Sequence, residues 1–219
     1  MSEPASARRP IKARDTRWAA AIATWMAGQG IRPNTISVCS ALFAGLAGFA
    51  LWLTPNVGAG AGSGLFLLAA GGIQLRLLCN LFDGMVAIEG GFKTKSGDIF
   101  NELPDRFADV FVLVGCGYAA GRLPGGVMLG WLAAVLAVGT AYVRALGASV
   151  GVGQCFLGPM AKQHRMATVT LASLACTALV FHGWAAWGMG AALVVVVAGG
   201  AVTIARRALW IVRALEARP

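Results

Sequence analysis

Six of the nine acidic residues in this 219-residue chain lie between positions 83 and 109, within or beside long apolar segments. A charged side chain in a membrane span costs roughly 2.5–3.5 kcal/mol, so such residues are usually paired, hydrated or bound to a ligand. The bland alternative is that the acids only mark helix ends at the water boundary. That explanation suits Glu89 and Asp98, but apolar residues surround Asp83, Asp105 and Asp109. The cluster therefore indicates a functional site.

Two pairs of oxygen-bearing side chains in this region have helical spacing. Asn80 and Asp83 are three residues apart, and Asn101 and Asp105 are four apart, so each pair projects from one helix face. If the two helices face each other, four oxygen donors converge, which suits a hard divalent cation such as Mg²⁺ or Mn²⁺. The sequence thus predicts a cation site shared by two helices.

Small residues extend the same two helix faces. Gly84 and Ala87 follow Asp83 along one helix, and Gly97 lies one turn before Asn101 on the other. Without bulky side chains, a flat or phosphorylated ligand has room to approach the backbone there. These positions therefore leave space for such a ligand beside the cation.

A second, basic cluster lies farther along the chain. Lys162 and Arg165 are three residues apart at the expected start of a helix, whose N-terminus also attracts anions. Arg144, near the end of the preceding span, is placed to join them. One interpretation is a site for an acceptor or lipid phosphate, and the other is ordinary anchoring of basic residues at the membrane surface. The sequence alone leaves both open.

The composition indicates an integral membrane protein. Apolar residues make up 58% of the chain and charged residues 12%, and the mean hydropathy is +0.71, whereas soluble domains carry roughly 25% charge. The same figures exclude a disordered chain. The basic residues that give the net charge of +9 are expected at cytoplasmic helix ends. The sequence has no basic face with interleaved aromatic residues, so it does not indicate nucleic-acid binding. Five scattered cysteines without a CxxC pair indicate neither a zinc site nor a disulfide framework.

The elements that must position these residues follow from hydropathy. We expect an all-α fold: a basic flexible arm at 1–15, an interfacial amphipathic helix within 16–30, a six-helix transmembrane catalytic domain at 31–208 and a cytoplasmic basic tail at 209–219. Trp18, Ile22 and Trp25 give the first helix one apolar face. Pro104 either breaks the third span or, as we favour, marks where its helix starts. The expected spans are 35–53, 62–82, 98–120, 124–150, 166–182 and 185–205.

Loop charges predict the orientation of the bundle. The connections after the first, third and fifth spans contain a single basic residue, Arg122. The other connections and the two termini contain all the remaining basic residues that lie outside the spans. The positive-inside rule places that other side, both termini and the acidic cluster in the cytoplasm of a bacterial-type inner membrane. Trp52, Trp184 and Trp187 then form part of the outer aromatic belt.

The motif residues resemble the signature of the CDP-alcohol phosphatidyltransferase family, D-x-x-D-G-x-x-A-R, eight residues, then G-x-x-x-D-x-x-x-D. The spacing in this chain matches throughout, and the Arg32-Pro33-Asn34-Thr35 entry to the first span and the six expected spans extend the resemblance over nearly the whole chain. The positions that match in identity are Asp83, Gly84, Ala87, Gly97 and Asp105, and those that depart are Asn80, Asn101 and Ile88.

The resemblance implies a specific reaction. Family members join a CDP-linked alcohol, usually CDP-diacylglycerol, to a second alcohol in phospholipid biosynthesis and release CMP, with Mg²⁺ or Mn²⁺ as cofactor. It implies that Asp105 is the general base, that Arg144, Lys162 and Arg165 are suited to a phosphorylated acceptor, and that the protein is a homodimer. By position, it implies a metal shell of Asn80, Asp83, Asn101 and Asp105, and a nucleotide site of Asn80, Asp83, Gly84, Ala87 and Gly97.

The departures leave several outcomes open. Because Asn80 and Asn101 replace aspartates, the formal charge of the four-residue shell is −2 instead of −4. The site then holds one metal, or two with Glu89 or Glu102 recruited, or it is catalytically silent and binds only a lipid or nucleotide. A third class, a small transporter with a charge relay through Arg76, lacks an evident inverted repeat.

Overall fold

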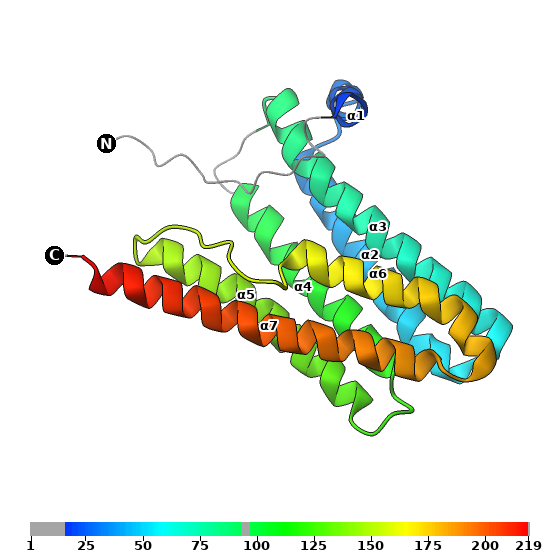
Figure 1. Ribbon diagram of the computed structural model, residues 1–219. Helices are drawn as coiled ribbons and strands as arrows, with labels where there is room; N and C mark the ends of the chain where they lie inside the picture. The colour runs from blue at the N-terminus through cyan, green and yellow to red at the C-terminus, as the bar shows by residue number, and fades with distance from the viewer. Residues whose placement is uncertain (1–15, 93–96, 219) are drawn as a thin grey trace.

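The computed structural model describes residues 16–92 and 97–218, without the side chains of Asp98 and Asn101. Within these ranges the regular structure is helical throughout (Figure 1), and the predicted arm at 1–15 lies outside them. Two short 3-10 turns, η2 (Thr54–Asn56) and η3 (Val180–His182), adjoin the helices. The helices are α1 (Arg17–Gly28), α2 (Pro33–Leu53), α3 (Ala59–Glu89), α4 (Gly97–Ala119), α5 (Gly126–Ser149), α6 (Lys162–Leu179) and α7 (Ala185–Glu216).

Among the described residues, five helical segments are long and apolar enough to cross a membrane: α2 with η2, α3, α5, α6 with η3, and α7. The prediction of an all-α membrane fold is confirmed at this level. Helix α4 has 23 residues, so its length also suffices, but it carries the charged side chains of the acidic cluster.

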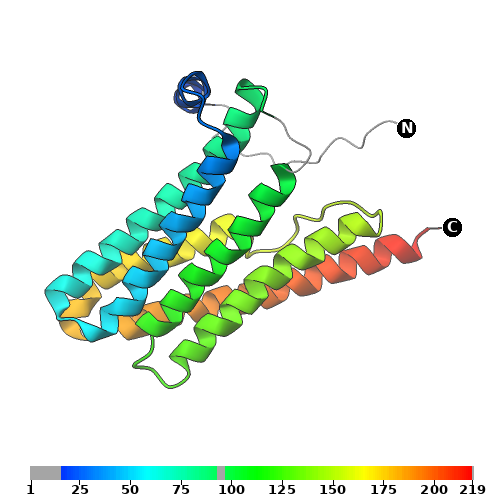
Figure 2. The same cartoon turned by 180° about the vertical axis from the view of Figure 1, so that it is seen from behind.

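The six long helices form a closed ring of neighbours. Helix α2 packs against both α3 and α4, α4 against α5, α5 against α7, α7 against α6, and α6 against α3. Figures 1 and 2 show α2 between α3 and α4 from both sides. Because α3 and α4 touch each other only slightly, side chains of α2 complete the space between the two helices that carry the signature.

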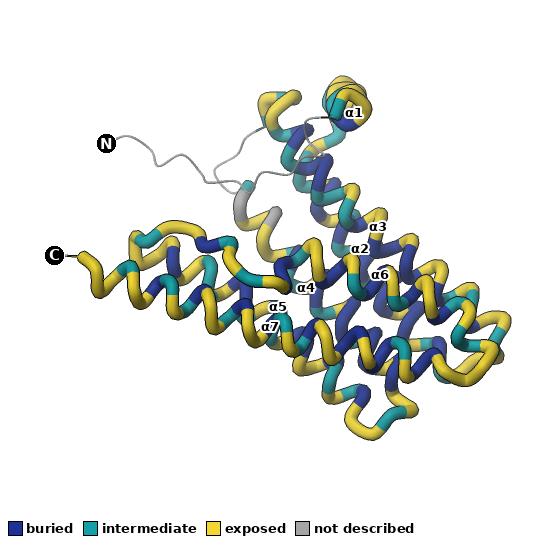
Figure 3. Tube along the Cα trace, in the orientation of Figure 1, coloured by how far each residue is buried: buried dark blue, intermediate teal, exposed yellow. Residues whose placement is uncertain are grey.

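Glycines set the closest helix contacts. A Cβ added at Gly48 of α2 would lie 2.3 Å from the backbone oxygen of Phe111 on α4, and one at Gly115 of α4 would lie 2.4 Å from the oxygen of Gly48. Gly117 and Gly130 bring α4 and α5 together in the same way. The backbones therefore touch, as small residues allow in membrane bundles. Figure 3 shows the buried positions on the inner faces and exposed positions along the outside.

Helix α1 lies across the bundle and is seen nearly end-on in Figure 1. Its small residues Ala19 and Ala23 are fully buried and belong to a cluster with α3 residues. The large side chains Trp18, Ile22 and Trp25 are 39–62% exposed. The apolar stripe expected from the sequence thus faces outward, while the alanine face packs on the protein.

Several boundaries differ from the expectation. Helix α3 continues past 82 to Glu89, and α7 continues past 205 to Glu216, without a break at 208. The interpretation of Pro104 as a helix start is wrong, because α4 begins at Gly97 and holds the proline in its interior. Proline has no N–H, so the carbonyl of Phe100 lacks its usual helical donor. The polar residues at the ends of α3 and α7 continue the helices, because most of the stability of a helix comes from the packing of its apolar face.

Candidate active site

The first half of the signature lies on α3 and faces α2. Asp83 is 4% exposed; its Oδ2 accepts a hydrogen bond from the Ser37 hydroxyl (3.0 Å), and its Oδ1 accepts one from the N–H of Gly84 (2.5 Å). One turn earlier, Asn80 Oδ1 accepts from the Ser40 hydroxyl (3.3 Å). The two serines are three residues apart on α2, so they meet the two α3 side chains in register.

The second half of the signature lies on α4. Asp105 is 7% exposed, and its Oδ2 is paired with the ammonium of Lys162, the first residue of α6. Nη2 of Arg76, from α3, lies 3.8 Å from Oδ1 of Asp105 and 3.4 Å from its backbone oxygen. Residues of α3, α4 and α6 therefore meet at Asp105, the last position of the signature.

The fourth position of the predicted shell is only partly described. Asn101 lies on α4 one turn before Asp105, but its side chain is outside the described residues. The structure thus brings Asn80, Asp83 and Asp105 into one region and leaves the part of Asn101 a prediction.

A buried ion bridge next to the signature was not predicted. Asp109 is fully buried, with Oδ1 2.6 Å from Nη2 of Arg76 and Oδ2 2.7 Å from Nη2 of Arg165. Nη1 of Arg165 also donates to the Thr140 hydroxyl (3.1 Å) and to the backbone oxygen of Met160 (3.1 Å). The bridge joins α3, α4 and α6 one helical turn beyond Asp105 on α4.

A signal for this bridge was present in the sequence. Arg76 is four residues before Asn80, and Asp109 is four residues after Asp105, so each shares a helix face with a signature residue. Both lie in apolar surroundings, where charges need partners. Sequence spacing does not pair the two residues with each other, because it does not establish which helices are neighbours.

The predicted basic cluster divides into two environments. Arg165 is 2% exposed and engaged in the bridge, whereas the side chains of Lys162 and Arg144 are both 23% exposed. Nη2 of Arg144 lies 2.5 Å from Oε1 of Glu102, whose Oε2 pairs with Arg106 (3.1 Å). Arg144 and Lys162 are therefore the two members with access to a ligand.

The small signature residues line the end of α3 and the start of α4. Gly84 and Ala87 are half-buried on α3, and Gly97 is the first residue of α4. Ile88, in the place of the family arginine, is 57% exposed, and Glu89 is exposed at the end of α3. The positions expected beside a nucleotide thus stay accessible at one end of the bundle.

The oxygen donors around Asn80 and Asp83 fit a divalent ion. No group of three or more His, Cys, Asp or Glu that could hold a metal occurs in the described part of the chain, so substrate and amide oxygens must complete a shell. Nδ2 of Asn80 is buried without a hydrogen-bond partner. Turning the amide over lets Nδ2 donate to Ser40 and frees the carbonyl oxygen as a ligand beside Asp83.

Comparison with known proteins identifies distant relatives. No model of a protein family matches the sequence. A protein of Aquifex aeolicus without an assigned function is 32% identical over 124 residues, which are 56% of this chain and 58% of that relative. The archaetidylinositol phosphate synthase of Methanothermobacter thermautotrophicus is 29% identical over 174 residues, 78% of this chain and 82% of that enzyme.

Solved structures share the fold. The phosphatidylinositol phosphate synthase of Mycobacterium tuberculosis, crystallised with CDP-DAG bound, superposes with a TM-score of 0.71 and 19% identity, covering 90% of this chain and 94% of that one. A crystal of the same enzyme in complex with manganese and citrate gives a TM-score of 0.70, with 88% of each chain covered. The fold expected from the signature is therefore confirmed.

Proposed function

We propose that this chain is a CDP-alcohol phosphatidyltransferase, on the strength of its signature, its fold and its archaeal relative, and that it transfers a phosphatidyl-type group from a CDP-alcohol to an alcohol acceptor and releases CMP. CDP-diacylglycerol is the first candidate donor, because the solved structure with this fold carries CDP-DAG. The observation that carries the proposal is the contact of Arg76, one turn before Asn80 on α3, with Asp105 on α4 at 3.8 Å, which places the two halves of the signature on neighbouring helices.

The chain's own residues have distinct parts in this reaction. Asn80 and Asp83 hold the metal, and Gly84, Ala87 and Gly97 border the cytidine and its phosphates. When bound, Mg²⁺ or Mn²⁺ supplies positive charge against the pyrophosphate; a crystal of the M. tuberculosis enzyme holds manganese.

Asp105 accepts the proton of the acceptor hydroxyl. The hydroxyl oxygen then forms a bond to the phosphorus that carries the donor alcohol, the bond between that phosphorus and the CMP oxygen breaks, and CMP leaves. Because Asp105 is 7% exposed, bulk water competes little with the acceptor for this step.

We propose a phosphorylated polyol as the acceptor. The cations Arg144 and Lys162, whose side chains are 23% exposed, would attract its phosphate, while the buried Arg165 holds α6 in place through its ion pair with Asp109. Inositol phosphate is tested first, since the similar enzymes are named phosphatidylinositol phosphate and archaetidylinositol phosphate synthases. Glycerol phosphate and serine are the competing acceptors.

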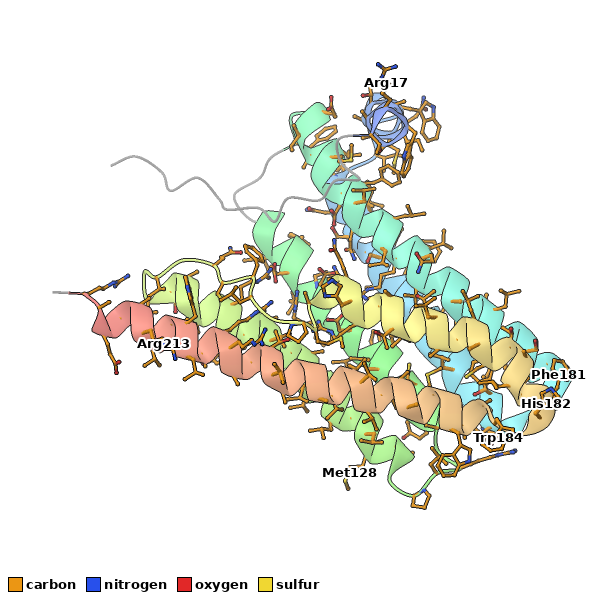
Figure 4. The ribbon with its side chains drawn as sticks, in the orientation of Figure 1. Arg17, Met128, Phe181, His182, Trp184 and Arg213 are labelled. Atoms are coloured by element: carbon orange, nitrogen blue, oxygen red, sulfur yellow. The ribbon has the colours of Figure 1, made fainter. Side chains whose placement is uncertain are left out.

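The same proposal includes the membrane arrangement. We propose that α4 is the sixth span, that α1 lies in the interface with its tryptophans in lipid, and that the active site and both termini face the cytoplasm. In Figure 4, Arg17 and Arg213 lie toward one end of the molecule, and Phe181, His182 and Trp184 lie at the other. We also propose a homodimer, for which the exposed small residues Gly60 and Gly64 offer a close-packing face on α3.

The function is tested by CMP release from the purified protein in nanodiscs. With CDP-diacylglycerol, Mn²⁺ and the acceptor panel, we expect CMP and a lipid product whose mass contains inositol phosphate. Asp83→Ala is expected to lower the rate by roughly 100-fold or more, as loss of a charge-stabilising group does. Glu216→Gln, at an exposed position on α7, is the matched control. No CMP with any acceptor would contradict the proposal.

A catalytically silent protein of the same fold is the second candidate, favoured by Asn80, Asn101 and Ile88. It predicts binding of a cytidine nucleotide or lipid without turnover in the native chain. Turnover that appears only after Asn80→Asp combined with Asn101→Asp would support this candidate and exclude the first.

A further inference from the structure

The two acids of the signature have different electrostatic surroundings. Asp83 is met by a hydroxyl and an N–H, and among the described residues no Lys, Arg or His nitrogen lies within 4.0 Å of its carboxylate. Asp105 has three cations within that distance, namely Lys162, Arg76 at 3.8 Å and Arg106 at 3.9 Å. A metal ion therefore meets no competing cation at Asp83 but must displace an ammonium at Asp105.

The net charge of the signature points in the same direction. Four aspartates would give the shell a charge of −4, which balances two divalent ions, whereas Asn80 and Asn101 leave −2, which balances one. Amide oxygens still bind Mg²⁺ or Mn²⁺ but contribute no charge. A second divalent ion would thus find no further carboxylate charge in the signature to balance it, and it would lie next to Arg76 and Lys162.

Lys162 is placed where helix stability disfavours it. It is the first residue of α6, and the N-cap position before it makes no side-chain hydrogen bond. A cation at a helix N-terminus is unfavourable because the helix dipole is positive there. The ion pair with Asp105 offsets this cost, and it fixes both the ammonium and the positive end of α6 at the carboxylate.

We propose that Lys162 provides the second positive charge of this active site, in place of a second metal ion, and that the site holds one divalent ion at Asn80 and Asp83. This inference rests on the proposed transferase function. Lys162 holds Asp105 with one of its three N–H donors and has another for a phosphate oxygen of the donor. Its third N–H donor, together with Arg144, remains for the acceptor phosphate.

The inference is tested by counting bound Mn²⁺ on the native chain in nanodiscs of neutral phosphatidylcholine, with CDP present, from the electron paramagnetic resonance signal of free Mn²⁺. We expect one Mn²⁺ per chain in the native protein and in Asn101→Asp, which keeps Lys162. We expect two in the double variant Lys162→Met with Asn101→Asp, which opens Asp105 and restores a third carboxylate. Lys162→Arg is the matched control and should stay at one.

Any native stoichiometry other than one overturns the inference, whatever the variants do. A double variant that folds, as judged by its helical circular dichroism, and still binds one Mn²⁺ also overturns it. CMP release from the same preparations separates this failure from that of the proposed function. An active native chain with two bound ions removes only the role of Lys162, whereas an inactive chain removes the transferase proposal itself. Lys162→Met alone should lower CMP release by roughly 100-fold.

Discussion

At the scale of single residues, the strongest interactions lie one helical turn beyond the signature. Asp109 joins Arg76 and Arg165, so two guanidinium groups share one carboxylate inside the bundle. Nε of both arginines is buried without a partner. Buried charges of this kind are retained at a desolvation cost and become strongly destabilising when one partner is removed. The bridge therefore fixes the helices that hold Asp105 and Lys162.

Asp109→Asn should lower the free energy of unfolding by about 3–5 kcal/mol, because it leaves two buried guanidinium groups without their shared carboxylate. The measurement is the denaturation midpoint of the purified protein, followed by tryptophan fluorescence. Glu102→Gln is the matched control: this side chain is 52% exposed and pairs with Arg144 and Arg106, so we expect a change within about 1 kcal/mol. Equal effects of the two substitutions would contradict the role given to the bridge.

At the scale of elements, α2 decides how the two signature helices meet. It lies between α3 and α4, and its serines bond to Asn80 and Asp83 on one side. On its other side, Gly48 lets the α4 backbone approach to contact distance at Phe111. This close approach keeps Asp109 of α4 within reach of Arg76 of α3. The geometry of the site thus depends on a helix that carries no signature residue.

Gly48→Ala should disturb both stability and activity. The added Cβ would lie 2.3 Å from a backbone oxygen, so α2 and α4 must separate, at about 1–3 kcal/mol for such overpacking. Gly45→Ala, one turn away on α2, meets only a ring carbon at 3.9 Å and should be neutral or more stable by about 0.5–1 kcal/mol. Thermal unfolding and CMP release of the two variants, measured side by side, test this; a Gly48→Ala protein as stable as Gly45→Ala would refute it.

At the scale of the whole molecule, the two ends of the bundle differ in charge, as the longest helix shows. Arg213 and the exposed Trp184 lie near opposite ends of the long helix α7 (Figure 4). Large apolar side chains are exposed along the outer faces between these ends, for example Leu42, Leu67 and Val194. This polarity agrees with the proposed orientation, in which the basic end and the candidate site face the cytoplasm.

Fusions to the termini test the proposed orientation and the number of spans together. Six spans place both ends in the cytoplasm, so green fluorescent protein at either terminus should fluoresce and alkaline phosphatase there should be inactive. Five spans, with α4 outside the membrane, would place the two termini on opposite sides. A fusion after Arg122 is the control, since that connection is expected on the outer side and should give active phosphatase.

The sequence by itself determined the class of fold and the position of the site along the chain. Hydropathy predicts membrane helices because burying apolar side chains in lipid depends on local composition alone. The spacing of Asn80 with Asp83, and of Asn101 with Asp105, predicts which side chains share a helix face, since that follows from 3.6 residues per turn. Both kinds of information are local, and the helices agree with them apart from their lengths.

Only the tertiary structure decided which faces meet. The pairing of Asp109 with Arg76 and Arg165, and of Lys162 with Asp105, joins residues 33 to 57 positions apart on different helices. Periodicity cannot reveal these partners, because a helix face is compatible with many neighbours until the close contact of α2 with α4 selects one arrangement. The charge balance of the site, and with it the proposed single metal ion, follows from that selection.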